Sequence, residues 1–127
     1  MQDSYVHKGK RKILIDYLRD KMGIEDENVL AAINKVPRHL FLESVFEDFA
    51  YEDRAFPILA KQTISHPSTV AEQTALLEIK EKDKVLEIGT GCGYQTAVLI
   101  ALNAWVYTIE RQKSLHDFSV NKLRELN

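Results

Sequence analysis

The chain has 127 residues and a formal net charge of −2, with 17 Lys and Arg against 19 Asp and Glu. This length suits one ordinary domain, and the balanced charge argues against a nucleic-acid partner bound through a broad cationic face. No apolar stretch approaches the roughly 20 residues of a membrane-spanning helix, and no apolar signal core follows Met1. A single cysteine excludes an intrachain disulfide, which fits a reducing compartment. Together, these features lead us to expect a cytoplasmic protein with no membrane partner.

The first third of the chain predicts helices. Residues 1–9 are polar and predict a loose arm that continues into a solvated basic cluster at residues 10–12. Apolar residues at three- and four-residue steps predict one amphipathic helix over residues 10–22 and a second that follows Asp26 and extends to residue 36. The second helix should end before Pro37, because a residue that precedes proline avoids the helical region.

The middle of the chain changes character twice. The aromatic side chains of a short apolar element at residues 39–49 are assigned to the core. Residues 51–67 lack a helical period and predict an extended or looped segment. Pro67 suits the first turn of a new helix, with Ser65 or His66 near its cap. The residues of this helix expected to point inward are Val70, Ala71, Thr74 and Leu77, with Leu76 as a further candidate.

The last third predicts alternating strands and helices. The expected elements are a strand at 84–88, a helix at 94–102, a strand at 104–109 and a helix at 112–126. A strand, a crossover helix and a strand imply a parallel pair with a right-handed connection. Two strands do not complete a covered sheet. We therefore expect a helical region at 1–83 and an incomplete cofactor-binding region at 84–127, which is truncated or self-associates through an exposed strand edge.

A glycine-rich turn follows the first predicted strand. Gly89, Gly91 and Gly93 alternate at the carboxyl end of that strand, where open α/β sheets bind their ligands. Glycine brings no Cβ and tolerates positive φ, so a ligand can approach the backbone. Glu110 ends the next strand, where a carboxylate can accept hydrogen bonds from both ribose hydroxyls. This pairing indicates an adenosine-containing ligand.

The residues around the turn narrow the choice of ligand. No Gly-Lys-Ser/Thr follows the glycines, which argues against a nucleoside triphosphate. Tyr94 stands where a dinucleotide fingerprint needs a small residue, which argues against a nicotinamide oxidoreductase. Glu87 would repel a pyrophosphate but suits a ligand with an ammonium and a sulfonium, such as S-adenosylmethionine. A tight turn without a ligand and a generic small-molecule methyltransferase are the alternatives.

Two residue types in the chain carry less information. Cys92 lies inside the turn, and no residue nearby in the sequence would activate its thiol, so we interpret it as a small space-filling side chain. The four histidines show no metal-ligand spacing with each other or with Cys92, so the sequence predicts no metal site.

Five segments, in the same order, resemble the protein-L-isoaspartate O-methyltransferases. They are VPRHLF at 36–41, AYEDR at 50–54, QTISHP at 62–67, VLEIGTGCGY at 85–94 and YTIER at 107–111. The QTISHP segment is the most specific of the five. The resemblance runs from about residue 29 to the C-terminus and implies a fold class: α/β, with N-terminal helices followed by the start of a Rossmann-like S-adenosylmethionine-dependent methyltransferase fold.

The resemblance also implies an activity and a set of site residues. The family methylates the abnormal carboxylate of L-isoaspartyl residues in aged proteins, which begins their repair. Ser65 falls at the position of the family's active-site serine, and Gln62, Thr63 and Ile64 would help to form the wall of the pocket. The residues expected to bind S-adenosylmethionine are Gln62, Thr63, Ile64, Glu87, Gly89, Thr90, Gly91, Gly93, Glu110 and Arg111.

The expected chemistry needs only modest residue types. A carboxylate nucleophile is already ionised at neutral pH, so catalysis depends mainly on alignment. We expect the Ser65 hydroxyl to orient one carboxylate oxygen; the alternative is that Ser65 only caps the helix that begins at Pro67. Family members continue through further strands and helices, which predicts an incomplete form here. The alternative function is an inactive fragment that binds S-adenosylmethionine or self-associates.

Overall fold

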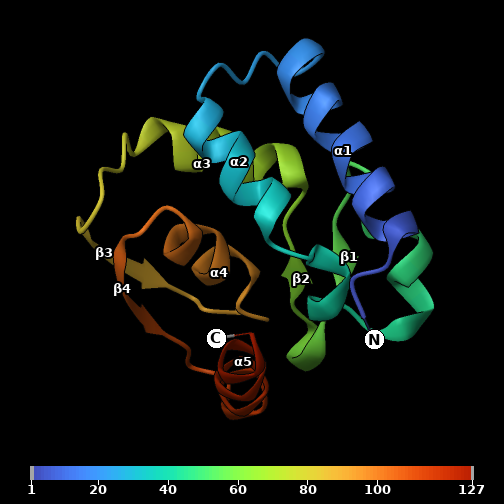
Figure 1. Cartoon of the computed structure of the whole chain (residues 1–127). Helices are drawn as coiled ribbons and strands as arrows, with labels where there is room; N and C mark the ends of the chain where they lie inside the picture. Colours follow the sequence, from blue (N-terminus) through green and yellow to red (C-terminus); the bar gives the residue numbers. More distant parts are fainter. Residues whose placement is uncertain (1, 127) are drawn as a thin grey trace.

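The computed structural model describes residues 2–126, which form layers of helices beside a small parallel sheet. Helix α4 (Tyr94–Ala101) lies between the sheet and α2 (Glu27–Lys35), and α2 packs in turn against α1 (Tyr5–Asp20) (Figure 1). Within the described range, no helix is both long and apolar enough to cross a membrane.

Helix α1 begins earlier than the sequence predicts. The Ser4 hydroxyl accepts a hydrogen bond from the His7 amide at 3.3 Å, and the His7 ring accepts one from the Ser4 amide at 3.2 Å. This reciprocal capping box starts the helix at Tyr5, so the predicted loose arm is wrong over most of its length. The prediction of a solvated basic cluster is wrong for Arg11, which is only 5% exposed, and correct for Lys12, which is exposed.

Helix α2 has the limits that the sequence predicts. The Asp26 carboxylate accepts hydrogen bonds from the amides of Asn28 and Val29, which would otherwise lack partners in the first turn. The helix ends at Lys35, and Val36 is extended, as the residue before a proline should be.

Two short 3₁₀ helices follow, η1 (Arg38–Phe41) and η2 (Ser44–Phe49). The prediction that their aromatic residues belong to the core is correct for Phe41, which is 1% exposed, and wrong for Phe49, which is 45% exposed. A third, η3 (Leu59–Lys61), connects the two short strands described next.

The segment before α3 consists of turns, η3 and short extended stretches, in agreement with the predicted extended or looped segment. Strands β1 (Phe56–Pro57) and β2 (Thr63–Ile64) pair antiparallel. Helix α3 (Pro67–Leu76) begins with proline, and the carboxylate of Asp53 accepts a hydrogen bond from the Ser68 amide at 2.8 Å. The inward prediction is wrong for Leu76, the last residue of α3, and for Leu77, which follows it, because they are 77% and 57% exposed.

The predicted parallel pair is confirmed. Strands β3 (Lys84–Ile88) and β4 (Trp105–Ile109) pair in parallel, and α5 (Lys113–Glu125) follows β4. Side chains alternate along both strands, so one face packs under α4 and the other is open. The large apolar residues of the open face, each more than half exposed, are Leu86, Ile88, Trp105, Tyr107 and Ile109.

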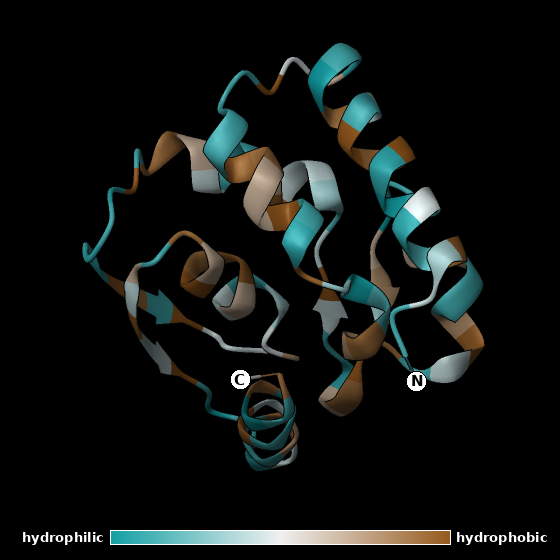
Figure 2. Ribbon diagram, in the orientation of Figure 1, coloured by the Kyte–Doolittle hydropathy of each residue, from teal (hydrophilic) through white to brown (hydrophobic). Residues whose placement is uncertain are grey.

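One hydrophobic core joins the two predicted regions of the chain. Leu18 and Ile33 from the helical region and Val98 from α4 are at most 1% exposed and belong to the same cluster. Figure 2 shows this pattern: α4 is mostly apolar, whereas α1 and α5 alternate between polar and apolar positions. The core therefore holds the glycine-rich turn against the N-terminal helices.

Candidate active site

The glycine-rich turn lies at the carboxyl edge of the sheet. Backbone amides of Gly89 and Thr90 both donate to the Ile109 carbonyl, at 2.8 and 3.1 Å, which joins the turn to the neighbouring strand. Gly89 has φ +87°, and a Cβ added there would meet no atom within 4 Å. The backbone at Gly89 is thus both left-handed and open to an incoming ligand.

Gly93 has a different environment. Its φ of +93° favours glycine, and a Cβ there would lie 3.4 Å from Leu123 and Ser119 of α5. It does not line either cavity described below. Its position supports close packing between the turn and α5, and its predicted role in cofactor binding stays a prediction.

Glu110 bridges the turn and the start of α5. Its carboxylate accepts hydrogen bonds at 2.8 Å from the Gly91 amide and, through the other oxygen, from the Gln112 amide. These backbone donors, first Gln112 and then Gly91, hold the pKa of Glu110 below its usual value. The carboxylate is therefore ionised at neutral pH and held in place, and each oxygen keeps a lone pair for a further donor.

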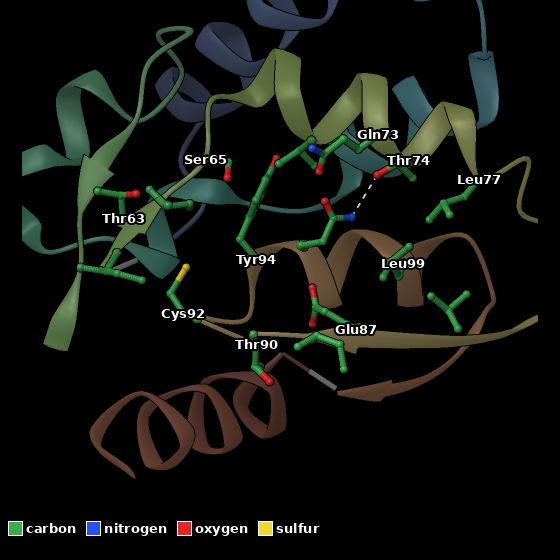
Figure 3. Close-up of a pocket in the computed structure, with 18 of the residues that line it drawn as sticks. Thr63, Ser65, Gln73, Thr74, Leu77, Glu87, Thr90, Cys92, Tyr94 and Leu99 are labelled. Carbon is green, nitrogen blue, oxygen red and sulfur yellow. Dashed lines mark hydrogen bonds between the residues drawn. The ribbon is translucent and has the colours of Figure 1, made fainter. Parts of the chain in front are cut away.

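Two adjoining cavities meet at this edge. The first, of about 350 Å³, extends between α3 and β3, and most of the predicted site residues lie on its wall (Figure 3). The second, of about 430 Å³, shares Ile88 and Gly89 with the first. Predicted residues on the first are Thr63, Ile64, Ser65, Glu87, Gly89, Thr90 and Gly91, and those on the second are Gln62, Gly89, Glu110 and Arg111. We refer to the two cavities together as the cleft.

Glu87 lies on the floor of the cleft within a network of hydroxyl groups. Its carboxylate accepts hydrogen bonds from Thr96 at 2.5 Å and from Thr108 at 2.7 Å, and Thr108 lies 2.6 Å from the Thr90 hydroxyl. Burial raises the pKa of Glu87, and the two threonine hydroxyls oppose that rise. The network therefore ties an acidic group to the turn and to both strands.

Ser65 lies at the rim of the cleft, exposed, between β2 and α3. Its side chain does not cap α3. The N-cap residue is His66, and the Asp53 carboxylate accepts the hydrogen bond from the Ser68 amide in the first turn. Within residues 2–126, no hydrogen bond to the Ser65 hydroxyl is found, so that group is available to a ligand.

Sequence reasoning missed several residues on the cleft wall. Gln73 and Thr74 of α3 and Gln95 of α4 lie there, and Gln95 donates to the Thr74 hydroxyl at 3.0 Å. Tyr94 is 2% exposed, and its side chain extends from the start of α4 toward Ser65 (Figure 3). The sequence signal that points to the wall residues of α3 is their polar side chains, because they lie on the same helix as the residues predicted to point inward. Cys92 is buried beside them, and burial raises the pKa of its thiol.

Beneath Ser65 lies Arg38, which is fully buried. Its guanidinium donates to the carbonyl oxygens of Ala50, Arg54 and Ser65 at 3.0, 3.2 and 2.8 Å. It also lies 4.9 Å from the centroid of the Tyr94 ring. One buried side chain therefore fixes the backbone at these three positions, including Ser65 at the rim of the cleft.

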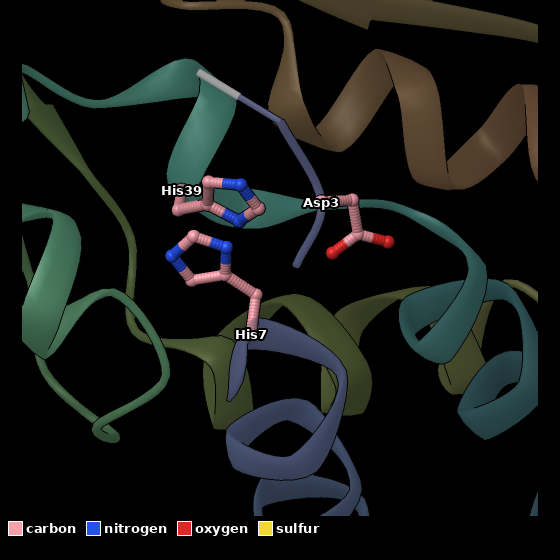
Figure 4. A group of neighbouring side chains, drawn as sticks. All are labelled: Asp3, His7 and His39. Carbon is pink, nitrogen blue, oxygen red and sulfur yellow. The ribbon is translucent and has the colours of Figure 1, made fainter. Parts of the chain in front are cut away.

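A second polar cluster forms at the N-terminus from residues that the sequence does not associate: Asp3, His7 and His39 (Figure 4). The two imidazole rings stack, with centroids 3.7 Å apart and planes inclined by 18°. Arg11 donates to both oxygens of Asp3, at 3.0 and 2.9 Å. The carboxylate of this cluster is thus already paired with a cation, and the predicted absence of a metal site stays a prediction.

The comparisons place the chain among known sequences. The family described as Protein-L-isoaspartate(D-aspartate) O-methyltransferase matches residues 9–127. Two curated proteins named Protein-L-isoaspartate O-methyltransferase, from Christiangramia forsetii and Flavobacterium johnsoniae, are each 58% identical to the chain and cover 99% and 100% of it. The chain spans 59% of the length of each of these relatives.

Solved structures agree with the fold. A protein-L-isoaspartate O-methyltransferase superposes with a TM-score of 0.81 at 27% identity, over 91% of this chain and 38% of that one. A structure from Plasmodium falciparum, described as a protein of the same type in complex with S-adenosyl-L-homocysteine, gives 0.75 at 26% identity, over 91% and 55%. The fold class expected from the sequence, the opening part of an α/β methyltransferase, is thereby confirmed. The chain belongs to the protein-L-isoaspartate(D-aspartate) O-methyltransferase family.

Proposed function

We propose that the chain binds S-adenosylmethionine in the cleft and that the bound cofactor's methyl group is directed to the free carboxylate of an L-isoaspartyl residue in a protein or peptide. The observation that carries this proposal is the convergence of Gly89, Glu110 and Ser65 on one cleft. These three come from separate segments of the chain, and each offers what a different part of the reaction needs.

The residues present suit the cofactor. Gly89 leaves the backbone open, and the fixed carboxylate of Glu110 has lone pairs for ribose hydroxyls. Glu87 places a negative group on the cleft floor, which favours a cationic ligand over a pyrophosphate. S-adenosylmethionine supplies an electrophilic methyl group on a sulfonium.

The residues of the chain then need only to align the acceptor. A carboxylate is ionised at neutral pH, so no side chain has to remove a proton before methylation. The Ser65 hydroxyl can donate to one oxygen of the acceptor carboxylate and leave the other free. Holding the acceptor in line in this way removes much of the entropic barrier.

Binding of S-adenosyl-L-homocysteine, measured by calorimetry, tests the cofactor half of the proposal. Wild-type chain should bind, and Glu110→Gln should bind about tenfold more weakly, which corresponds to about 1.4 kcal/mol. Glu125→Gln is the matched control, because Glu125 is exposed on α5 and pairs only with Lys122 in the described chain. Absence of binding by the wild type at millimolar ligand contradicts the proposal.

Transfer of labelled methyl groups to an isoaspartyl peptide tests the catalytic half. Ser65→Ala should lower the turnover about tenfold or more while leaving S-adenosyl-L-homocysteine binding within twofold, because Ser65 is assigned to the acceptor. Ser114→Ala, at an exposed position of α5, is the control. Cofactor binding without methyl transfer by the wild type would refute the assigned reaction.

A second candidate function, a self-associating module, is favoured by one observation. The open face of the β3–β4 sheet exposes five large apolar side chains, an unusual patch for a monomer. Sedimentation velocity tests it: an Ile109→Lys variant should shift a wild-type oligomer to monomer, and a monomeric wild type would remove the candidate.

A further inference from the structure

Among the described residues, no carboxylate lies within ion-pair distance of the positively charged Arg38, and Asp53 acts on its charge only from farther away. Its three hydrogen-bond acceptors are backbone carbonyls, and its Nη1 atom is buried with no partner among the described residues. Arginine stays protonated in proteins even though burial lowers the pKa of Arg38. Buried charges are ordinarily paired, so a fully buried and unpaired cation next to a binding cleft calls for a ligand-related explanation.

The position of this charge is on the acceptor side of the cleft. Arg38 donates to the carbonyl of Ser65 itself, and its guanidinium lies against the ring of Tyr94, which forms part of the cleft wall. The guanidinium packs directly on the Tyr94 ring, and Arg38 and Tyr94 are 0% and 2% exposed. A charge in such surroundings is poorly screened and acts over a longer range than a surface charge.

The opposite part of the cleft carries the opposite charge. Glu87 lies on its floor, on β3, whereas Ser65 and Tyr94 lie toward α3 (Figure 3). The positive sulfonium of a methyl donor is complementary to Glu87, and the negative carboxylate of an acceptor is complementary to Arg38. The charges of the cleft are therefore arranged to hold both reactants in one orientation.

We propose that Arg38 is a positioning residue that makes the rim of the cleft at Ser65 selective for an anionic acceptor. This inference rests on the proposed function and deepens it. The guanidinium does not contact the substrate: it fixes the backbone of Ser65 and supplies the field that prefers a carboxylate over a neutral group of the same shape.

The test compares two peptides that differ only in charge, bound to the full chain in the presence of saturating S-adenosyl-L-homocysteine. One peptide contains an L-isoaspartyl residue, and in the other a carboxamide replaces the isoaspartyl carboxylate. Wild-type chain should bind the acidic peptide about tenfold more tightly. Arg38→Met should lose most of that preference, while its affinities for the carboxamide peptide and for S-adenosyl-L-homocysteine change less than twofold.

Arg38→Lys separates charge from structure and covers the case in which Arg38→Met does not fold. Lysine retains the charge but not the planar fork that reaches three carbonyls. The acidic preference should therefore survive within about twofold even though the variant is less stable.

Each remaining outcome contradicts the inference. Loss of the preference in Arg38→Lys, its retention in folded Arg38→Met, or an equal fall in all three affinities would overturn the role of Arg38 and leave the proposed function intact. A wild-type chain that binds cofactor but neither peptide would overturn the proposed substrate and the role of Arg38 together.

Discussion

The N-terminal cluster and the region beneath the cleft each bury an arginine, and they satisfy it in opposite ways. Arg11 donates to both oxygens of Asp3 and to the Tyr51 hydroxyl at 2.9 Å, so its charge is neutralised within the protein. Arg38 donates to three carbonyl oxygens and lies against an aromatic face, and no ion pair of Arg38 is found among the described residues. Each arginine keeps one buried nitrogen without a partner among the described residues, Nε of Arg11 and Nη1 of Arg38, but only the second arrangement leaves a net charge next to the predicted acceptor site. Burial alone therefore does not distinguish a structural arginine from one that serves a ligand. The charge of the groups that pair with the guanidinium makes this distinction.

The largest expected effect comes from removing each arginine in turn. Arg38→Met should lower the free energy of unfolding by about 3 kcal/mol, because three carbonyl oxygens lose their donor inside the protein. Arg11→Met should cost about 1 kcal/mol, since Asp3 is 27% exposed and can be hydrated. Urea denaturation followed by circular dichroism measures both. Equal costs, or the reverse order, would contradict the comparison.

The next effect tests whether Arg11 depends on its acid. Asp3→Asn leaves the buried guanidinium charged, and we expect a loss of about 2 kcal/mol, less than for a fully buried pair because Asp3 is partly exposed. The double variant with Arg11→Met should recover part of the loss. Asp16→Asn, in an exposed pair with Arg19, is the control and should change stability by less than about 0.5 kcal/mol. Additive costs in the double variant would show that the two groups are not coupled.

A smaller effect is expected at the start of α3, next to Ser65. Asp53→Ala removes the acceptor of the Ser68 amide and should cost about 1 kcal/mol, the usual value of an N-terminal cap. Asp48→Ala is the control, because the Asp48 side chain is 87% exposed. If both variants unfold at the same urea concentration, the cap does not stabilise the rim of the cleft.

The smallest effect is a dependence of stability on pH at the N-terminal cluster. Burial, and then the neighbouring His7, lower the pKa of His39 in the folded chain. The unfolded chain therefore binds more protons, so stability should fall as the pH drops below about 6.5. His39→Gln should flatten this fall in melting temperature between pH 7.5 and 5, whereas His116→Gln, at an exposed histidine, should not. An unchanged slope in His39→Gln would contradict the assignment.

Local patterns predict much of the fold and of the candidate site. The periodicity of apolar residues locates α2, β3, α4 and β4 within one or two residues, and glycine spacing locates the turn. Contacts between distant segments are not contained in such patterns. Arg11 is read as solvated because neighbouring positions are basic, yet Asp3 and Tyr51 make its burial favourable. The cap of α3 by Asp53 and the position of Arg38 under Ser65 likewise depend on how separate segments fold against one another.

Trp105 gives the open face of the sheet a built-in optical signal. It is the only tryptophan in the chain, it is 56% exposed, and it lies on β4 beside Tyr107 and Ile109. Its fluorescence should have the red-shifted emission of a hydrated indole, and anything that covers this face should shift the emission to the blue. Self-association can thus be followed in unlabelled protein, separately from ligand binding at the carboxyl edge of the strands.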